Sequence, residues 1–242
     1  MFAVRAEAQS NEDYHVEAGV SFWKPTPEIV LNTGGSSTDF DLSDIFQLED
    51  EQFREFRVFL KPGRKHRIRF QYTPIEYAKD TVVNRTFVFQ GRTFNVNVPA
   101  TADFSWKLMR LGYEWDFVAT DRGFVGVIGE VKLNTVEATI TSTALASVAA
   151  TDVKAPIPTF GGIARGYLAS SVSVTAEFTG FKLTRDDFRG KFFDFDVYGM
   201  AHVGRHLGIQ AGYRSLDVDY LVDEDTGVFK LKGPYFGGVL RF

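Results

Sequence analysis

The 242-residue sequence contains no cysteine, which excludes a disulfide framework, a thiolate metal site and a lipid anchor on cysteine. It has no apolar run that approaches about eighteen residues, so we expect no membrane-spanning helix. Basic residues are not in excess, because 27 Lys and Arg face 31 Asp and Glu, and this balance argues against a nucleic-acid partner. Walker, dinucleotide-binding and zinc-binding motifs are absent as well. The chain therefore carries no common nucleotide-binding or metal-binding signature.

The residues that are abundant favour strands. The chain has 24 phenylalanines and 22 glycines, and aromatic residues make up 15% of it. Aromatic side chains suit pleated strands, and glycine permits close backbone contacts. Apolar and polar residues alternate with a period of two, which is typical of strands with one apolar face. The clearest runs are residues 14–22, 56–60, 68–72, 125–133 and 172–179.

The number and length of these runs favour a membrane barrel. We count about ten strands of about 10 to 16 residues, longer than the usual five or six residues of a soluble sheet. A tilted strand needs about nine to eleven residues to cross a bilayer. Tight turns alternate with longer polar segments along the chain, as in outer-membrane barrels. We therefore predict an all-β fold, a single up-and-down antiparallel transmembrane β-barrel of about ten strands, with eight or twelve strands as open alternatives.

One stretch departs from the simple alternation. Trp106 and Leu108 are apolar at even positions, whereas Leu111 and Tyr113 are apolar at odd positions. A shift of phase by one residue is typical of a β-bulge, so we expect a bulge near Met109.

The polar face of the strands combines glycine with fully charged residues. A water-facing strand seldom needs glycine in its interior, because glycine weakens strands, whereas a narrow lumen needs small residues beside paired charges. We therefore expect charges of both signs to face each other across a narrow or plugged lumen. The residues of this charge ladder are Arg57, Arg69, Glu130, Lys132, Glu177, Asp194, Asp196 and Arg214.

Several large aromatic residues are candidates for a girdle on the lipid-facing surface. Amphipathic rings settle at the headgroup level of a bilayer, so we expect them near one interface or the other. The girdle residues are Trp23, Tyr72, Trp106, Trp115 and Tyr213.

The last strand ends with an aromatic residue in phase with its apolar face. Phe236, Leu240 and Phe242 lie on that face, and this ending resembles the C-terminal signal that the outer-membrane barrel assembly machinery reads. The chain over residues 12–242 also resembles small bacterial outer-membrane β-barrel proteins of uncharacterised function. The stretches that carry the resemblance best are 65–72, 110–117 and 212–220.

This resemblance implies an integral protein of a Gram-negative-type bacterial outer membrane. Its partners would be the membrane lipids, lipopolysaccharide and the assembly machinery, which would act on the C-terminal strand. The resemblance brings no catalytic motif with it. We expect a monomer without a cofactor and without a nucleic-acid partner.

Residues 1–11 read as a remnant of an export signal. Ala6, Glu7 and Ala8 form a small-x-small triplet before a polar stretch, as at a signal-peptidase site, but the apolar core that precedes such a site is missing. Either the start was trimmed or the likeness is accidental. We assign residues 1–11 to this tail and residues 12–242 to the barrel domain.

The four histidines do not favour an enzyme. An outer-membrane hydrolase meets its substrate at the extracellular rim, where the long loops lie. If the first strand rises from the periplasm, all four histidines fall at the periplasmic side, where they suit hydrogen bonding rather than catalysis. We therefore expect no catalytic residue and no enzymatic activity, and a role as a narrow or plugged channel, as a binding surface or in the structure of the envelope. The histidines are His15, His66, His202 and His206.

Two alternatives stay open. Asp186, Asp187 and Ser36 lie in long loops, so the first alternative is an outer-membrane hydrolase acting at the extracellular rim. The second is a soluble, lipocalin-like barrel whose apolar face would line a ligand cavity. The acidic loop at 34–52 offers carboxylates to a divalent cation, but a run of charges is usually a solvated face, and we assign no metal site.

Overall fold

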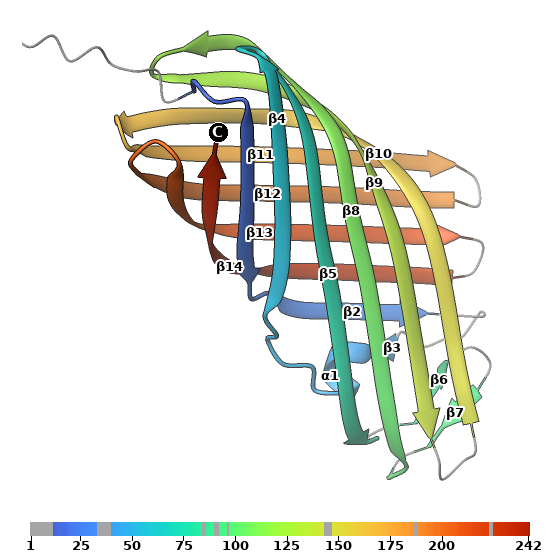
Figure 1. Cartoon of the computed structure of the whole chain (residues 1–242). Coiled ribbons are helices and arrows are strands. Elements are labelled where there is room, and N and C mark those ends of the chain that lie inside the picture. Colours follow the sequence, from blue (N-terminus) through green and yellow to red (C-terminus); the bar gives the residue numbers. More distant parts are fainter. Residues whose placement is uncertain are drawn as a thin grey trace, which may run out of the picture.

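Ten antiparallel strands form a closed barrel in the computed structural model of the chain (Figure 1). The predicted fold class, a single barrel of about ten strands, is confirmed. The structure describes residues 12–32, 40–83, 86–89, 92–95, 97–142, 147–185, 188–222 and 225–242. In the order of their pairing, the strands of the wall are β1 (Val16–Trp23), β4 (Phe53–Gly63), β5 (His66–Val82), β8 (Pro99–Thr120), β9 (Gly123–Ser142), β10 (Ser147–Ala169), β11 (Val172–Arg185), β12 (Phe188–Val203), β13 (Leu207–Val222) and β14 (Asp225–Arg241).

The barrel closes where the last strand returns to the first. Phe22 of β1 pairs with Phe236 of β14, and the two strands are antiparallel. Val16 and Phe242 exchange two backbone hydrogen bonds, each 2.9 Å long. Closure satisfies the backbone groups that an open sheet would leave at its edges.

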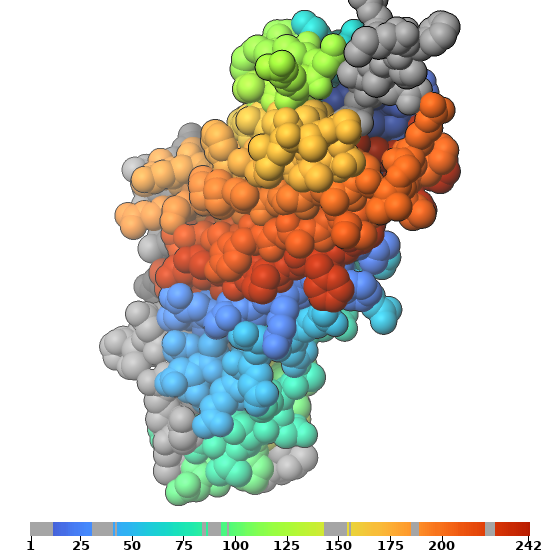
Figure 2. Space-filling view, turned by 90° about the vertical axis from the view of Figure 1, so that its left-hand side faces the viewer, coloured from blue at the N-terminus to red at the C-terminus, as the bar shows by residue number. Residues whose placement is uncertain are grey.

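The first half of β14 has a further partner. It pairs with β2 (Thr26–Asn32), which in turn pairs with the short β3 (Phe40–Asp41). The short helix α1 (Leu42–Ile45) packs on β2, where the backbone N–H of Ile29 donates to Ser43 Oγ at 2.8 Å. Figure 2 shows β14 in red, β2 in blue and the helical segment in light blue as successive layers of one wall.

A hairpin near residue 90 lies apart from the barrel wall. Its strands, β6 (Phe87–Phe89) and β7 (Arg92–Phe94), form a two-stranded sheet of their own. Phe94 is fully buried in the apolar cluster of the barrel interior, which anchors the hairpin to the barrel. The hairpin therefore adds no strand to the wall.

The two rims of the barrel differ in their connections. At one rim, termed the turn rim, tight turns join β4 to β5, β8 to β9, β10 to β11 and β12 to β13. Gly204, with a φ of +72°, supplies the left-handed conformation that the last of these turns needs. The start of β1 and the end of β14 lie at the same rim. The opposite rim, termed the loop rim, carries α1 and the hairpin of β6 and β7.

Halfway along the long strands, the inward face changes from apolar to charged residues and the outward face changes from polar to apolar residues. On β8, the inward residue Leu108 is followed by the inward residue Arg110, and both are buried. Outward residues change in the opposite sense, from Lys107 to Leu111. The half of the barrel near the loop rim thus has an apolar interior and a polar outer surface. The half near the turn rim has a charged interior and an apolar outer surface.

The β-bulge that the sequence predicts near Met109 is wrong, and the exchange of the two faces explains the pattern instead. The pairing of β8 with β5 runs without a shift from Trp115 to Pro99. Apolar residues change face because the surroundings of the two faces exchange, while the backbone keeps its alternation. The register shift in β8 lies between Trp115 and Val118, against β9.

A band of exposed apolar side chains encircles the turn-side half. All ten strands of the wall contribute to it. Among the described residues, no helix is long and apolar enough to span a membrane. One exposed apolar residue from each strand is named here: Val20, Phe56, Ile68, Leu111, Val127, Phe160, Val174, Phe195, Ile209 and Phe236.

Candidate functional site

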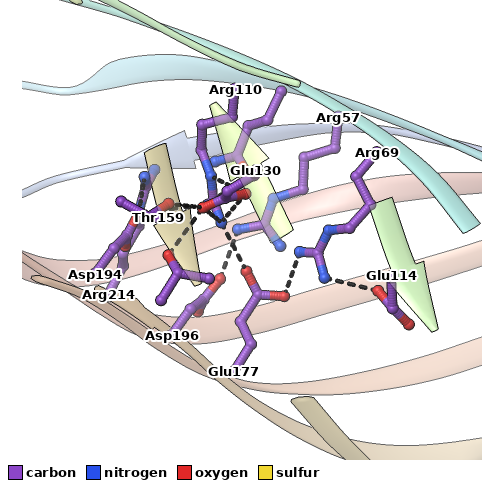
Figure 3. Close-up of polar contacts among 12 residues, drawn as sticks. Arg57, Arg69, Arg110, Glu114, Glu130, Thr159, Glu177, Asp194, Asp196 and Arg214 are labelled. Atoms are coloured by element: carbon purple, nitrogen blue, oxygen red, sulfur yellow. Dashed lines mark hydrogen bonds and ion pairs between the residues drawn. The ribbon is translucent and has the colours of Figure 1, made fainter. Parts of the chain in front are cut away.

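Charged side chains fill the interior of the turn-side half (Figure 3). Five cations and five carboxylates are buried there, so their formal charges cancel. They come from seven of the strands, and Figure 3 shows those that it labels pointing toward one another. This central network consists of Arg57, Arg69, Arg110, Lys132, Arg214, Glu55, Glu130, Glu177, Asp194 and Asp196.

Ion pairs of the central network join opposite walls of the barrel. Arg57 on β4 donates from Nη2 to Asp196 Oδ2 on β12 at 2.6 Å. Arg69 on β5 donates from Nη2 to Glu177 Oε2 on β11 at 2.6 Å. Neither pair of strands is adjacent in the sheet, so these bonds cross the lumen. Each charge would be costly to bury alone, and the partner across the lumen offsets that cost.

Asp194 is the meeting point of three cations. Arg214 donates to its Oδ1 from Nε at 3.0 Å and to its Oδ2 from Nη2 at 2.9 Å, in the two-pronged geometry that favours arginine. Lys132 Nζ lies 2.8 Å from Oδ2, and Arg110 Nη1 lies 3.4 Å from it. The site is therefore held from β8, β9 and β13 at once.

Hydroxyl groups complete the coordination of the second central carboxylate. Glu130 accepts from Arg110 at 3.1 and 3.2 Å, and its Oε1 accepts from Thr179 at 2.8 Å and from Thr159 at 3.1 Å. Because its oxygens accept from several protein donors, Glu130 is stabilised as an anion.

Aromatic rings separate the central network from the apolar half above it. The Arg214 guanidinium lies 5.1 Å from the ring centroid of Trp23, and Lys132 Nζ lies 4.4 Å from that of Phe192. Such contacts stabilise a desolvated cation by about 0.5 to 2 kcal/mol. The upper side of the network thus faces aromatic rings.

A second set of charges closes the turn rim. Glu12 precedes β1, and its carboxylate accepts from Arg67 at 2.6 Å, Lys61 at 3.0 Å and Arg165 at 3.1 Å. The hydroxyl of Tyr167 also donates to it. Burial alone would raise the pKa of Glu12, but the three nearby cations outweigh burial and hold its pKa well below the ordinary value of 4.5. Glu12 is therefore an anion inserted into the mouth of the barrel.

This mouth network is also balanced in charge. Arg69 links it to the central network through a 2.7 Å bond to Glu114. In the part of the chain that the structure describes, Lys61 and Arg165 have no carboxylate partner other than Glu12. The mouth network consists of Lys61, Arg67, Arg165 and Arg241 with Glu12, Glu17, Glu114 and Asp116.

One small cavity lies inside the lumen, beside the central network. A cavity lined by Glu17, Arg57 and Gln210 has a volume of about 10 Å³. A single water molecule needs about that much.

All eight residues of the expected charge ladder lie inside the barrel, in the central network. Sequence reasoning missed two of its members, Glu55 and Arg110, and the whole mouth network. Arg110 lies next to the expected bulge at Met109, which leaves its face undefined in the sequence. One signal could have placed it: Arg110 alternates with the apolar Leu111, which is exposed on the outer face, so Arg110 faces inward.

The structure divides the predicted aromatic girdle. Tyr72, Trp115 and Tyr213 are on the outer face of their strands. Trp23 and Trp106 are not, because they are only 1% and 2% exposed and lie inside the barrel. Both belong to the loop-side half or its boundary, where the interior is apolar, and the indole N–H of Trp106 donates to Asn134 Oδ1 at 3.0 Å. Burial in an apolar interior replaces the membrane interface as their surroundings.

The remaining predicted residues fall into three groups. Phe236, Leu240 and Phe242 lie on the outer face of the barrel end, and each is more than 40% exposed. The four histidines lie at the turn rim, and none has a carboxylate partner among the described residues. The residues that the structure describes contain no group of three or more His, Cys, Asp or Glu side chains that could hold a metal ion. Ser36, Asp186 and Asp187, the candidates for a hydrolase, lie outside the described residues, as do residues 1–11.

Comparison with known proteins identifies the fold. No family model matches the sequence, and no curated protein matches it. The outer membrane protease OmpT from Escherichia coli superposes with a TM-score of 0.58 at 6% identity, over 94% of this chain and 97% of that chain. The translocator domain of the autotransporter NalP from Neisseria meningitidis gives 0.50 at 10% identity, over 94% and 88%. At such identities only the fold is shared, and the chain has the fold of the small bacterial outer-membrane β-barrel proteins.

Proposed function

We propose that the chain is an integral, monomeric protein of a bacterial outer membrane that has no enzymatic activity and no open channel. Its sealed turn-side half would anchor a rigid loop-side half at the cell surface, in a binding or structural role. The observation that carries this proposal is the pair of charge-balanced networks that cross and close the lumen.

The outer surface supports a place in the membrane. On β9, outward apolar residues extend from Val125 to Leu133. This is about the length that a tilted strand needs to cross the hydrocarbon layer. The same half of the barrel keeps its charges inside, away from lipid, as membrane barrels do.

The loop-side half supports a role at the surface. Its interior is an apolar cluster that includes Trp106, Ile75 and Phe229, and the helical segment adds the buried Ile45 and Phe46. Its outer face is polar, as expected for a part that stands in water. A folded, well-packed surface of this kind suits contact with lipopolysaccharide or with another macromolecule better than transport through the barrel.

The C-terminal strand supports insertion by the barrel assembly machinery. Phe242 is 63% exposed, and its ring stacks on that of His206 at 5.7 Å, so the exposed part of the ring is accessible to a partner while the backbone closes the barrel against Val16. Recognition of the side chain and closure of the barrel therefore use different parts of the same residue.

Gel mobility before and after boiling tests the proposal. Intact membrane barrels keep their structure in SDS and migrate differently until they are boiled. We expect the purified protein to require detergent and to shift on boiling. A protein that is soluble without detergent and shows no shift, although correctly folded, would contradict the membrane assignment and favour the soluble barrel.

A further inference from the structure

A groove on the outer wall of the turn-side half has features that neither the sealed lumen nor the fold requires. It has a volume of about 540 Å³ and lies over β5, β8, β9 and β10. Its interpretation rests on the proposed function, because this wall then faces lipid. The lining residues that matter here are His66, Tyr113, Trp115, Val127, Gly129 and Phe160.

Gly129 creates the space in the groove. It pairs with Tyr113 on one side and with Phe160 on the other, so a missing side chain leaves a gap between two large rings. A Cβ at Gly129 would meet the Phe160 ring at 3.6 Å, an ordinary contact. At Gly112, by contrast, a Cβ would lie 2.7 Å from Glu130 Cβ, so packing requires glycine there. Packing does not require Gly129, and the groove is what the glycine provides.

The groove has a polar end toward the turn rim. His66, the first residue of β5, pairs with Trp115 in the register. Its Nδ1 and the Tyr113 hydroxyl share a hydrogen bond, and the two rings stack at 5.9 Å. In the described part of the chain the other ring nitrogen of His66 has no protein partner. The apolar groove thus ends at the His66 ring, which can donate a hydrogen bond.

Basic residues lie on the two turns beyond this polar end. Arg64, Lys65 and Arg122 are exposed on two adjacent turns, which Arg64 and Asp121 join by a 3.6 Å ion pair. The backbone N–H of Asp116 also donates to the Lys65 carbonyl at 2.8 Å. Three cations against one carboxylate leave the two turns positively charged.

We propose that this groove binds an anionic glycerophospholipid of the periplasmic leaflet. One acyl chain would lie along Gly129 between the rings of Tyr113 and Phe160. Its phosphate would face His66 and the basic turns. Charge complementarity selects this occupant, because an anionic headgroup brings a net negative charge to the cations of the turns. A zwitterionic headgroup carries its own cation beside the phosphate, and an apolar protein surface carries no anion.

Fluorescence of Trp115 provides a direct test. The chain has three tryptophans, and the other two lie inside the barrel, so bromine on a lipid chain reaches only Trp115. The protein is reconstituted into phosphatidylethanolamine vesicles with rising mole fractions of brominated phosphatidylglycerol or brominated phosphatidylcholine. We expect half-maximal quenching at a lower mole fraction of brominated phosphatidylglycerol than of brominated phosphatidylcholine. The difference should be about fivefold for each basic residue that contacts the phosphate.

Two variants and a control separate the parts of the site. Gly129→Leu fills the groove and should weaken quenching by both lipids. Arg64→Gln with Lys65→Gln should abolish the preference for phosphatidylglycerol and leave quenching by phosphatidylcholine unchanged. Gly199→Leu adds the same side chain to the outer face of β12, where a Cβ would come no closer than 3.9 Å to its nearest neighbour, and should change neither lipid's effect.

The outcomes are distinct. Equal quenching by the two wild-type titrations, or a Gly129→Leu protein that behaves like wild type, overturns the lipid site alone. Absence of quenching in a protein that still shifts on boiling means that another copy or another protein covers the groove, which also overturns it. Absence of quenching together with no gel shift means that the protein does not enter the membrane, and the proposed function fails as well.

Discussion

Leu108 and Arg110 are successive inward residues of β8, and the barrel interior changes from apolar to charged between them. The register places Thr73 of β5 and Asn134 of β9 on either side of Leu108. Both are buried and polar without charge, so the boundary follows the register across three strands. An outward change from polar to apolar accompanies it. The two changes together mark the level at which the barrel would enter the membrane.

Electrical measurements test the sealed lumen. We expect the wild-type protein in a planar bilayer to show no steady conductance. Arg57→Ala with Arg69→Ala removes bulk and positive charge from one wall and leaves Glu130 and Glu177, so conductance should rise and favour cations. Lys107→Ala, on the outer face, is the control and should stay silent. A large, stable wild-type channel would contradict the sealed lumen, and a silent double variant would place the main barrier in the mouth network.

Arginine substitution on the outer face of β9 tests the membrane boundary. Val131→Arg places a cation in the apolar band and should lower the free energy of unfolding by about 2 to 4 kcal/mol. Thr139→Arg lies on the same face of the same strand, beyond the boundary, and should change it by about 0.5 kcal/mol or less. Urea unfolding in lipid vesicles measures both. Equal effects would mean that the boundary between Leu108 and Arg110 is not the membrane surface.

Removal of the Glu12 charge tests the closure of the mouth. Glu12→Gln leaves Lys61 and Arg165 without a carboxylate and should destabilise the protein by about 3 kcal/mol, the lower end of the cost of breaking a buried ion pair. Asp13→Asn removes a charge from the exposed neighbour and serves as the control.

The same variant should show a defined pH dependence. Because the folded-state pKa of Glu12 is lowered, its stabilising effect is complete above the ordinary pKa of 4.5 and is lost as the pH falls toward the folded-state value. The difference in unfolding free energy between wild type and Glu12→Gln should therefore be constant from pH 7 to about pH 5 and shrink below that. If the difference in unfolding free energy is the same at pH 3 and pH 7, the charge of Glu12 does not stabilise the protein.

Two matched tryptophan substitutions test the corrected girdle. Trp106→Phe leaves the buried Asn134 without its indole donor and should cost about 1 to 3 kcal/mol of stability. Trp115→Phe keeps an aromatic ring on the outer surface and should cost about 0.5 kcal/mol or less. Thermal unfolding in detergent compares them. A larger loss of stability for Trp115→Phe than for Trp106→Phe would contradict this prediction and assign the larger stabilising effect to the outer girdle.

Much of the fold follows from short-range patterns in the sequence. Period-two alternation and tight turns such as the one around Pro62 and Gly63 predict long antiparallel strands joined in order. Each of these signals involves residues only a few positions apart, so it survives without knowledge of the fold. The charge ladder was predictable for the same reason, since Glu130 and Lys132 alternate with the exposed Val131 and Leu133 on one strand.

Alternation along a strand does not say which face is enclosed. The two predicted girdle residues that lie inside, Trp23 and Trp106, share the apolar character of those that lie outside. Their burial depends on whether the surroundings at that level are lipid or water. The apparent bulge near Met109 has the same origin, because a change of surroundings and a slip of the backbone produce the same sequence pattern.

The sequence by itself determined the strand order, the approximate strand number and the presence of a charged face in this protein. Only the tertiary structure decided the partners of those charges and the sealing of the mouth by Glu12. Arg57 and Asp196 are 139 residues apart in the chain and become neighbours because the barrel closes. Pairing across a lumen depends on closure and on the register of all ten strands together, and no local pattern in the sequence encodes that geometry.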